Sequence, residues 1–204
     1  MNSVIVSDSE AAAALAAGEV VAIPTDTVYG LAVDPRRPGA TELLFEAKGR
    51  PDSAALPVLV GDPAAAFELG ILAGAAARLV ERFWPGALTV VVRRGSAARA
   101  FELGGDPGTI GLRCPAHTLA AGLLRRAGPL AVSSANRHGG TPCHSAQEVL
   151  AAFGGSVPVL DGGECDGRPS TVVTVGPDGL ECLRQGAVAM SDLQHVLASA
   201  VHDP

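Results

Sequence analysis

The chain has 204 residues, 48% of them hydrophobic, and a net charge of −6 from 15 basic and 21 acidic side chains. This length suits one domain, which we expect to span residues 1–204, and the apolar content is sufficient for a core. The acidic balance and an aromatic content of 3% argue against a broad nucleic-acid-binding face, although a small basic groove stays compatible with them. The apolar runs are too short to cross a bilayer and the N-terminus lacks a signal-peptide pattern, so we expect a cytoplasmic protein without membrane contact.

The four cysteines are dispersed and form no Cys-x-x-Cys pair. Free thiols are therefore expected rather than disulfides. Histidines follow two of these cysteines, but without the paired spacing of zinc sites, so the sequence leaves the ligands of any metal unknown.

Hydrophobic periodicity and capping residues divide the chain into short, interspersed strands and helices. Strands are expected over residues 4–6, 20–23, 56–60, 87–92, 109–115, 130–132 and 157–160, with a hairpin over 170–175 and 180–183. Helices are expected over residues 10–17 (capped by Ser9), 41–48, 62–69 (capped by Asp62), 72–83, 117–126, 145–153 (capped by Ser145) and 191–201 (capped by Ser191). The order predicts an α/β protein with an open, twisted, mixed sheet and flanking helices.

The segment Lys48-Gly49-Arg50-Pro51 joins the only lysine of the chain to an arginine across a rigid bend. Lysine as a point charge and arginine as a fork suit an anion with several oxygen atoms. Alternatively, Lys48 complements the helix C-terminus and Arg50 is a solvated loop charge.

Three further clusters follow strands or lie along them. Residues 25–27 (Thr-Asp-Thr) follow a buried strand and form either a ligand-binding strand end or an ordinary capped turn. Thr109, Gly111 and Arg113 share one face of a strand, which either reaches an anion or is solvated. Residues 133–136 (Ser-Ser-Ala-Asn) lack a Gly-x-Ser-x-Gly pattern, so their expected role is hydrogen bonding rather than nucleophilic attack.

The chain contains no Walker A loop, no dinucleotide-binding glycine pattern and no His-Glu-x-x-His motif. The Thr/Asp/Thr, Lys/Arg, Thr/Arg and Ser/Asn clusters, together with Ser170 and Arg184, would instead hold a polyanion with cations and hydroxyl groups.

These clusters occur along the chain in the order found in the YrdC-like threonylcarbamoyl-AMP synthases, which the chain resembles from about residue 20 to residue 186. The motifs that carry the resemblance are residues 24–31, Lys-Gly-Arg-Pro at 48–51, Trp-Pro-Gly at 84–86, Gly-Leu-Arg-Cys-Pro at 111–115, Ser-Ala-Asn at 134–136, Asp-Gly-Gly at 161–163, Ser-Thr at 170–171 and Leu-Arg-Gln-Gly at 183–186. The resemblance implies a YrdC/RibB-like fold around a concave basic groove. It also implies a nucleotidyltransferase that converts ATP, L-threonine and bicarbonate to threonylcarbamoyl-AMP and pyrophosphate, with Mg²⁺ accompanying ATP. A tRNA-modifying threonylcarbamoyl transferase complex would then use the product.

The resemblance also implies roles for individual residues. Its catalytic set at the ATP phosphates corresponds to Lys48, Arg50, Ser134 and Asn136. Its threonine-binding positions correspond to Thr27, Arg113 and Ser170, with Arg113 pairing with the carboxylate. Its other nucleotide contacts correspond to Thr109 and Arg184.

The chain departs from many relatives at three positions. Ala54 replaces an asparagine that contacts ATP, Leu59 stands where some relatives place a histidine near threonine, and Cys143 stands where many have a serine. These departures leave open a paralogue of the same fold that adenylates another carbamoyl substrate. A separate alternative is a YrdC-fold module that uses the same groove to bind RNA without catalysis, and weak RNA binding is compatible with the small basic groove.

Overall fold

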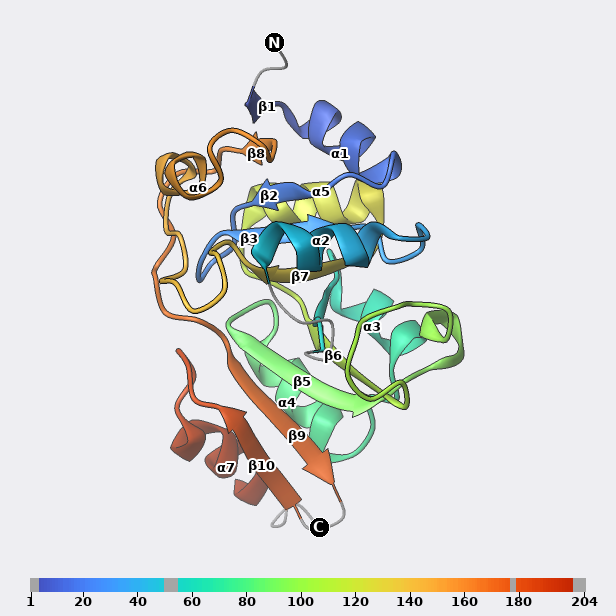
Figure 1. The fold of residues 1–204 in the computed structure, drawn as a ribbon. Helices are drawn as coiled ribbons and strands as arrows, with labels where there is room; N and C mark the ends of the chain where they lie inside the picture. Colours follow the sequence, from blue (N-terminus) through green and yellow to red (C-terminus); the bar gives the residue numbers. More distant parts are fainter. Residues whose placement is uncertain (1–3, 50–54, 177–178, 200–204) are drawn as a thin grey trace.

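A computed structural model describes residues 4–49, 55–176 and 179–199. In these residues ten strands form one sheet in the order β1-β8-β2-β3-β7-β4-β6-β5-β9-β10 (Figure 1). The strands are β1 (Ile5–Val6), β2 (Val21–Ile23), β3 (Gly30–Val33), β4 (Val58–Leu59), β5 (Leu88–Arg93), β6 (Thr109–Arg113), β7 (Leu130–Ser134), β8 (Val159–Leu160), β9 (Thr171–Gly176) and β10 (Gly179–Arg184).

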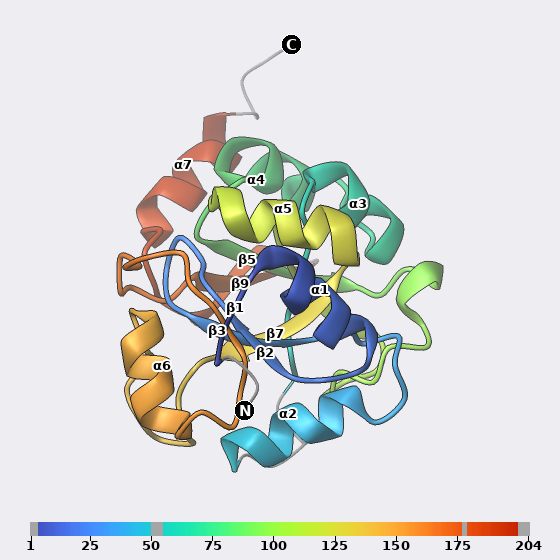
Figure 2. The same ribbon diagram turned by 90° about the horizontal axis from the view of Figure 1, so that it is seen from above.

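Seven α-helices and a short 3₁₀ helix, η1 (Ser96–Ala98), surround the sheet in the described part of the chain. The α-helices are α1 (Asp8–Ala16), α2 (Ala40–Lys48), α3 (Pro63–Leu69), α4 (Ala75–Phe83), α5 (Thr118–Ala127), α6 (Ala146–Phe153) and α7 (Met190–Ser199). Figure 2 shows α3, α4, α5 and α7 on one side of the strands and α2 and α6 on the other. Over residues 4–49, 55–176 and 179–199, no helix has both the length and the apolar character needed to cross a bilayer.

The sheet is mixed, as predicted. β3 runs antiparallel to both β2 and β7, and β4 runs antiparallel to β7 but parallel to β6. β5 is antiparallel to β6 and parallel to β9, whose other edge forms the hairpin with β10. The register pairs Gly30 with Ser134, so the loop that precedes β3 lies beside the end of β7. Two motifs that are far apart in the sequence therefore meet.

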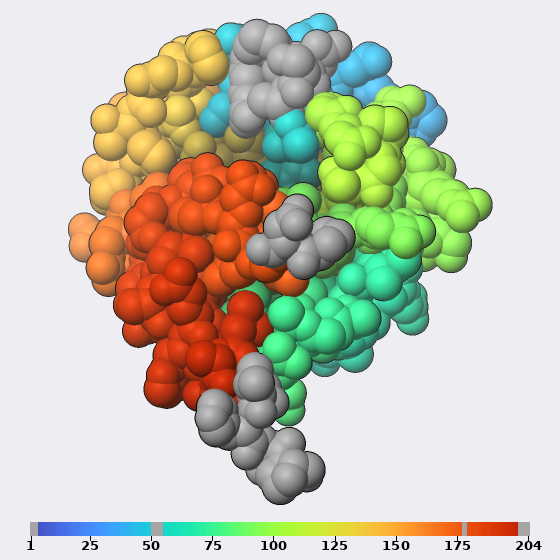
Figure 3. All heavy atoms as spheres, turned by 90° about the horizontal axis from the view of Figure 1, so that it is seen from below, coloured from blue at the N-terminus to red at the C-terminus, as the bar shows by residue number. Residues whose placement is uncertain are grey.

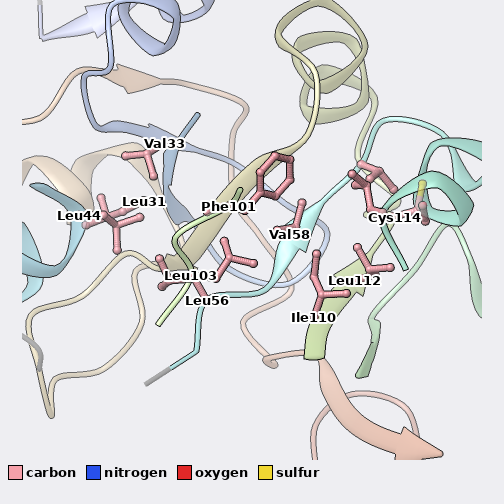
Figure 4. Close-up of a cluster of buried hydrophobic side chains, with 14 of the residues drawn as sticks. Leu31, Val33, Leu44, Leu56, Val58, Phe101, Leu103, Ile110, Leu112 and Cys114 are labelled. Carbon is pink, nitrogen blue, oxygen red and sulfur yellow. The ribbon is translucent and has the colours of Figure 1, made fainter. Parts of the chain in front are cut away.

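The core lies on both faces of the sheet. Leu15 of α1 and Leu123 of α5 pack with Ile23 and Val132 on one face. On the other face, Figure 4 shows Leu44 of α2 beside Leu31 of β3. Because the central strands are buried on both faces, they consist of near-continuous apolar runs rather than an alternating pattern.

The helix starts agree with the sequence at two of four predicted caps. The Asp62 carboxylate accepts from the Ala64 amide at 2.7 Å, and the Ser145 hydroxyl accepts from the Glu148 amide at 3.2 Å. The helix expected from residue 10 instead begins at Asp8, because Ser7 and Glu10 form a capping box that satisfies two amide groups at once. Ser191 is wrong as a cap, since α7 begins at Met190 and contains it.

Candidate active site

The strand ends and adjoining loops surround a cavity of about 370 Å³. Figure 3 shows a recess in the surface between α6, the loop around residue 100 and the orange-red β9–β10 hairpin. Of the predicted site residues, those that line the cavity are Thr27, Thr109, Arg113, Ser134, Ser170 and Arg184. Its volume is within the range of small-molecule sites. The sheet thus gathers side chains from residue 27 to residue 184 at one hollow.

Lys48 lies behind the part of the cavity wall that Ser134 forms, since Ser134 lines the cavity whereas Lys48 and Asn136 do not. Lys48 is only 3% exposed, and its Nζ lies 3.4 Å from Ser134 Oγ and 3.3 Å from Asn136 Oδ1. Nζ also donates to the backbone carbonyl of Ser134. The next residue, Gly49, adopts a left-handed conformation with φ of 62° that ends α2 directly after the lysine. The predicted Lys, Ser and Asn thus form one contacting cluster.

Asn136 is oriented by its own loop. Its amide nitrogen donates to the carbonyls of Arg137 and Gly140, at 2.8 and 2.9 Å. Its Oδ1 is therefore left to accept from Ser134 Oγ at 2.6 Å and to contact the ammonium. Because three oxygen atoms approach Nζ, the cluster holds the ammonium in a fixed position next to Ser134, which lines the cavity. We call such a cationic side chain, together with the residues that hold it, a cation site.

Arg113, at the end of β6, forms a second cation site. The residue is 5% exposed overall, and its three side-chain nitrogen atoms donate to three different residues in two segments. Nε donates to the Gly86 carbonyl at 3.0 Å, one terminal nitrogen to Thr27 Oγ1 at 3.0 Å, and the other to Asp26 Oδ1 at 2.6 Å. Burial lowers the pKa of Arg113, while the negative charge of Asp26 raises it. Arg113 and the predicted Thr27 are thus directly joined.

The third cluster joins Ser170, the residue before β9, to β5 and β10. Ser170 Oγ lies 2.9 Å from Thr89 Oγ1 and accepts from an Arg184 terminal nitrogen at 3.0 Å. Arg184 also donates to the Ser170 carbonyl. Sequence reasoning missed Thr89, although a lone hydroxyl in an otherwise apolar strand was a usable signal. Ser170 was predicted to bind threonine and Arg184 to contact the nucleotide, and these contacts place the two residues side by side.

Arg94 is a further lining residue that the sequence did not reveal. We expected residues 93–107 to form a polar surface loop. In the structure the Arg94 guanidinium donates to the carbonyls of Thr109 and Phe101, at 3.1 and 2.8 Å, and lines the cavity beside Thr109. Burial lowers the pKa of Arg94, and the charge of Asp106 raises it.

The cavity lining is electropositive. Among the described residues, three arginines line it and no aspartate or glutamate does. The described residues also contain no cluster of three or more His, Cys, Asp or Glu side chains that would hold a metal ion. The lining therefore suits an anionic ligand with several oxygen atoms.

The loop of residues 161–170 borders this cavity and is tied to the β2–β3 loop. The hydroxyl of buried Tyr29 accepts from the Gly162 amide at 3.0 Å and donates to the Gly163 carbonyl at 2.9 Å. The Gly167 amide donates to the Thr27 carbonyl at 2.6 Å. Burial is the main reason that the pKa of Tyr29 is raised to about 12. The loop is thus held over the residues that contact Arg113.

Some predicted features are outside the site or outside the described residues. Arg50 and Ala54 lie outside the described residues. Leu59 is 3% exposed and lines the cavity. Cys143 is buried but does not line it. Of the departures that can be placed, only Leu59 is therefore in a position to contact a ligand in the cavity.

Comparison with known proteins identifies relatives over most of the chain. The sequence model of the Sua5/YciO/YrdC family, described as telomere recombination, matches residues 13–186. A Mycobacterium tuberculosis protein is 38% identical over 190 residues, which are 92% of this chain and 87% of its own length. A Bacillus subtilis protein named threonylcarbamoyl-AMP synthase is 35% identical over 193 residues, which are 93% of this chain and 56% of its own length.

A solved structure gives the same result for the fold. Sua5 of Pyrococcus abyssi, crystallised with L-threonine, matches with a TM-score of 0.85 and 32% identity. The match covers 93% of this chain and 57% of the Sua5 chain, so this chain spans little more than half the length of that relative. From the matched family and these relatives, the chain belongs to the Sua5/YciO/YrdC family.

Proposed function

We propose that the chain is an L-threonylcarbamoyladenylate synthase, a nucleotidyltransferase that acts on ATP, L-threonine and bicarbonate. The observation that carries the proposal is the convergence of two distinct cation sites on one electropositive cavity. Thr27 and Arg113 line the cavity, and Lys48 and Asn136 contact Ser134, which lines it too. The names of the relatives support it, as does the solved relative that contains L-threonine.

In the proposed reaction, threonine and bicarbonate combine to a carbamate with loss of water. A carbamate oxygen then attacks the α-phosphorus of ATP, and the bond to the β-phosphate oxygen breaks to release pyrophosphate. The products are threonylcarbamoyl-AMP, pyrophosphate and water. The protein needs no nucleophile of its own, because its contribution is to hold the reactants in line and to stabilise charge on the phosphate oxygens.

The two cation sites divide these tasks. The Lys48 ammonium would contact phosphate oxygens, with Ser134 and Asn136 fixing its position. The Arg113 guanidinium would bind the threonine carboxylate, with Thr27 beside it. Thr109 of β6 and Arg184 of β10, which line the same cavity, would contact the nucleotide. Mg²⁺ would enter with ATP, as part of the substrate, because oxygen atoms of the phosphates are ligands that it prefers.

Pyrophosphate release tests the proposal. We expect purified protein with Mg²⁺ to release pyrophosphate only when ATP, threonine and bicarbonate are all present. Mass spectrometry should then detect threonylcarbamoyl-AMP in stoichiometric amounts. Cleavage of ATP that does not depend on threonine would contradict it. We propose further that the product passes to a tRNA-modifying transferase complex, which a coupled assay with tRNA and that complex would test.

The presence of Leu59 supports a second candidate function, that of a synthase that acts on an amino acid other than threonine. This apolar side chain lines the cavity where some relatives have a histidine near threonine. A thermal-shift screen of amino acids tests this, because a ligand of the native state raises the melting temperature. A larger shift with another amino acid than with threonine would support the changed substrate.

A further inference from the structure

Asp26 lies directly behind the proposed threonine site. Its carboxylate Oδ1 is 2.6 Å from a terminal nitrogen of Arg113, and its side chain is 16% exposed compared with 7% for the arginine. Thr27 and Arg113 line the cavity, whereas Asp26 does not. The acidic side chain therefore contacts the guanidinium from a side that leaves the cavity free of negative charge.

The hydrogen bonds of Arg113 determine which N–H groups of its guanidinium remain for a ligand. A guanidinium carries five N–H groups. In the described structure, Gly86 takes the one on Nε, Thr27 takes one on the first terminal nitrogen, and Asp26 takes one on the second. One N–H remains on each terminal nitrogen, and a pair of that kind matches the two oxygen atoms of a single carboxylate.

We propose that Asp26 is a positioning residue, which holds the Arg113 guanidinium so that its two remaining terminal N–H groups face the carboxylate of the amino-acid substrate. This inference rests on the proposed function, in which Arg113 binds that carboxylate. Asp26 belongs to the β2–β3 loop, Gly86 precedes β5 and Arg113 ends β6, so the contacts also join three segments.

The charge of Asp26 has two opposing effects on a bound carboxylate. As a counter-ion it stabilises the buried guanidinium, whose pKa is lowered by burial and by the nearby Arg184. It also reduces the attraction between Arg113 and an anion in the cavity. If positioning dominates, loss of the charge weakens threonine binding; if long-range attraction dominates, the same loss strengthens it. The sign of the change therefore distinguishes the two effects.

Asp26→Asn tests the proposal, because it keeps the shape and removes the charge. We expect the KM for threonine to rise at least tenfold while the KM for ATP stays within twofold of wild type. Asp26→Glu keeps a carboxylate and should recover part of the loss. An unchanged or lower threonine KM in Asp26→Asn would overturn the proposal.

Asp34→Asn is the matched control. Asp34 is also buried and paired with an arginine, with its Oδ1 2.7 Å from Arg36 Nε, but it does not line the cavity or contact Arg113. This variant should change the melting temperature without changing either KM. An equal rise of the threonine KM in Asp34→Asn would show a general loss of stability and would also overturn the proposal.

A double-mutant cycle shows whether Asp26 acts through Arg113. Calorimetry should give the same weak threonine affinity for Arg113→Ala and for Arg113→Ala with Asp26→Asn, and a further loss in the double variant would contradict the proposal. If Asp26→Asn does not fold, Asp26→Glu alone decides: its threonine KM should rise about threefold or more. Wild-type protein without threonine-dependent pyrophosphate release would instead refute the proposed function itself.

Discussion

The two cation sites of the cavity are built differently. The Lys48 ammonium contacts neutral oxygen atoms of Ser134 and Asn136, whereas the Arg113 guanidinium contacts the carboxylate of Asp26. Neutral oxygens can be exchanged for phosphate oxygens at little electrostatic cost, so the lysine end suits a group whose charge changes during reaction. A guanidinium with a fixed counter-ion has a fixed orientation, so it suits a substrate group that is bound but whose charge does not change during the reaction. The comparison predicts that the Lys48 end acts in catalysis and that the Arg113 end binds the amino-acid substrate.

Lys48→Ala should have the largest effect. In the proposed function the ammonium stabilises the phosphate oxygens in the transition state, so its loss should lower kcat/KM on the order of 10²–10³-fold, with kcat affected most. Steady-state pyrophosphate release measures it. Lys48→Arg is the control, because it keeps the charge but not the compact geometry and should recover little. Retention of more than half of the activity by folded Lys48→Ala would remove the distinction between the two ends.

Arg113→Lys should act on recognition rather than on the chemical step. Lysine keeps the charge but cannot present two parallel N–H groups, so the threonine KM should rise by about 10- to 100-fold. The kcat at saturating threonine and the KM for ATP should change little. A fall of kcat as large as that of Lys48→Ala would mean that the two ends are not separable.

Ser170→Ala should affect both substrates to a smaller extent. The change removes the hydroxyl that contacts both Thr89 and Arg184, and the loss of these hydrogen bonds costs about 1–2 kcal/mol, or roughly tenfold in kcat/KM. The KM values for threonine and ATP should both rise, because Ser170 joins their proposed sites. Thr174→Val is the control. Thr174 lies on β9, the strand that directly follows Ser170; its hydroxyl donates to the Val91 carbonyl, and the residue does not line the cavity.

The sequence was most informative where the determinants are local. Gly49 predicted the end of α2, and Asp62 and Ser145 predicted the starts of α3 and α6, because caps act within a few residues. Apolar runs predicted most strands, and their ends predicted where polar clusters would meet. Interspersed strands and helices indicated a mixed sheet, but the strand order depends on pairings that no local pattern records.

The partners of the site residues were the part that sequence reasoning could not supply. Asp26 and Arg113 are separated by 87 positions, and only the sheet brings them together. Residues 25–27 therefore read equally well as a turn or as a binding segment. Arg94 fell within residues 93–107, which were expected to form a surface loop. Its position at the cavity could not be predicted, because its acceptors are backbone carbonyls and every residue has one.

Tyr29→Phe should have the smallest effect, because it removes a single hydroxyl group. Tyr29 contacts residues at both ends of the cavity. Its carbonyl accepts from the Ala135 amide at 2.7 Å, between Ser134 and Asn136, while its hydroxyl holds Gly162 and Gly163. The variant keeps the backbone contact and loses only the hydroxyl. Both KM values should therefore rise together, by about threefold or less, and the free energy of unfolding should fall by about 1 kcal/mol at pH 7. A change in only one KM would assign Tyr29 to one end.

The pH dependence of unfolding checks the role of the same hydroxyl. The native fold raises the pKa of Tyr29 from 10.0 to about 12, so it favours the protonated hydroxyl. The resulting stability is fully present below pH 10 and is lost as the pH rises from about 10 to about 12. Cys114, whose pKa burial raises to about 11, titrates in the same range in both proteins. The melting temperature of wild type should therefore fall more steeply than that of Tyr29→Phe over this range, and parallel curves would show that the hydroxyl is not held in the native protein.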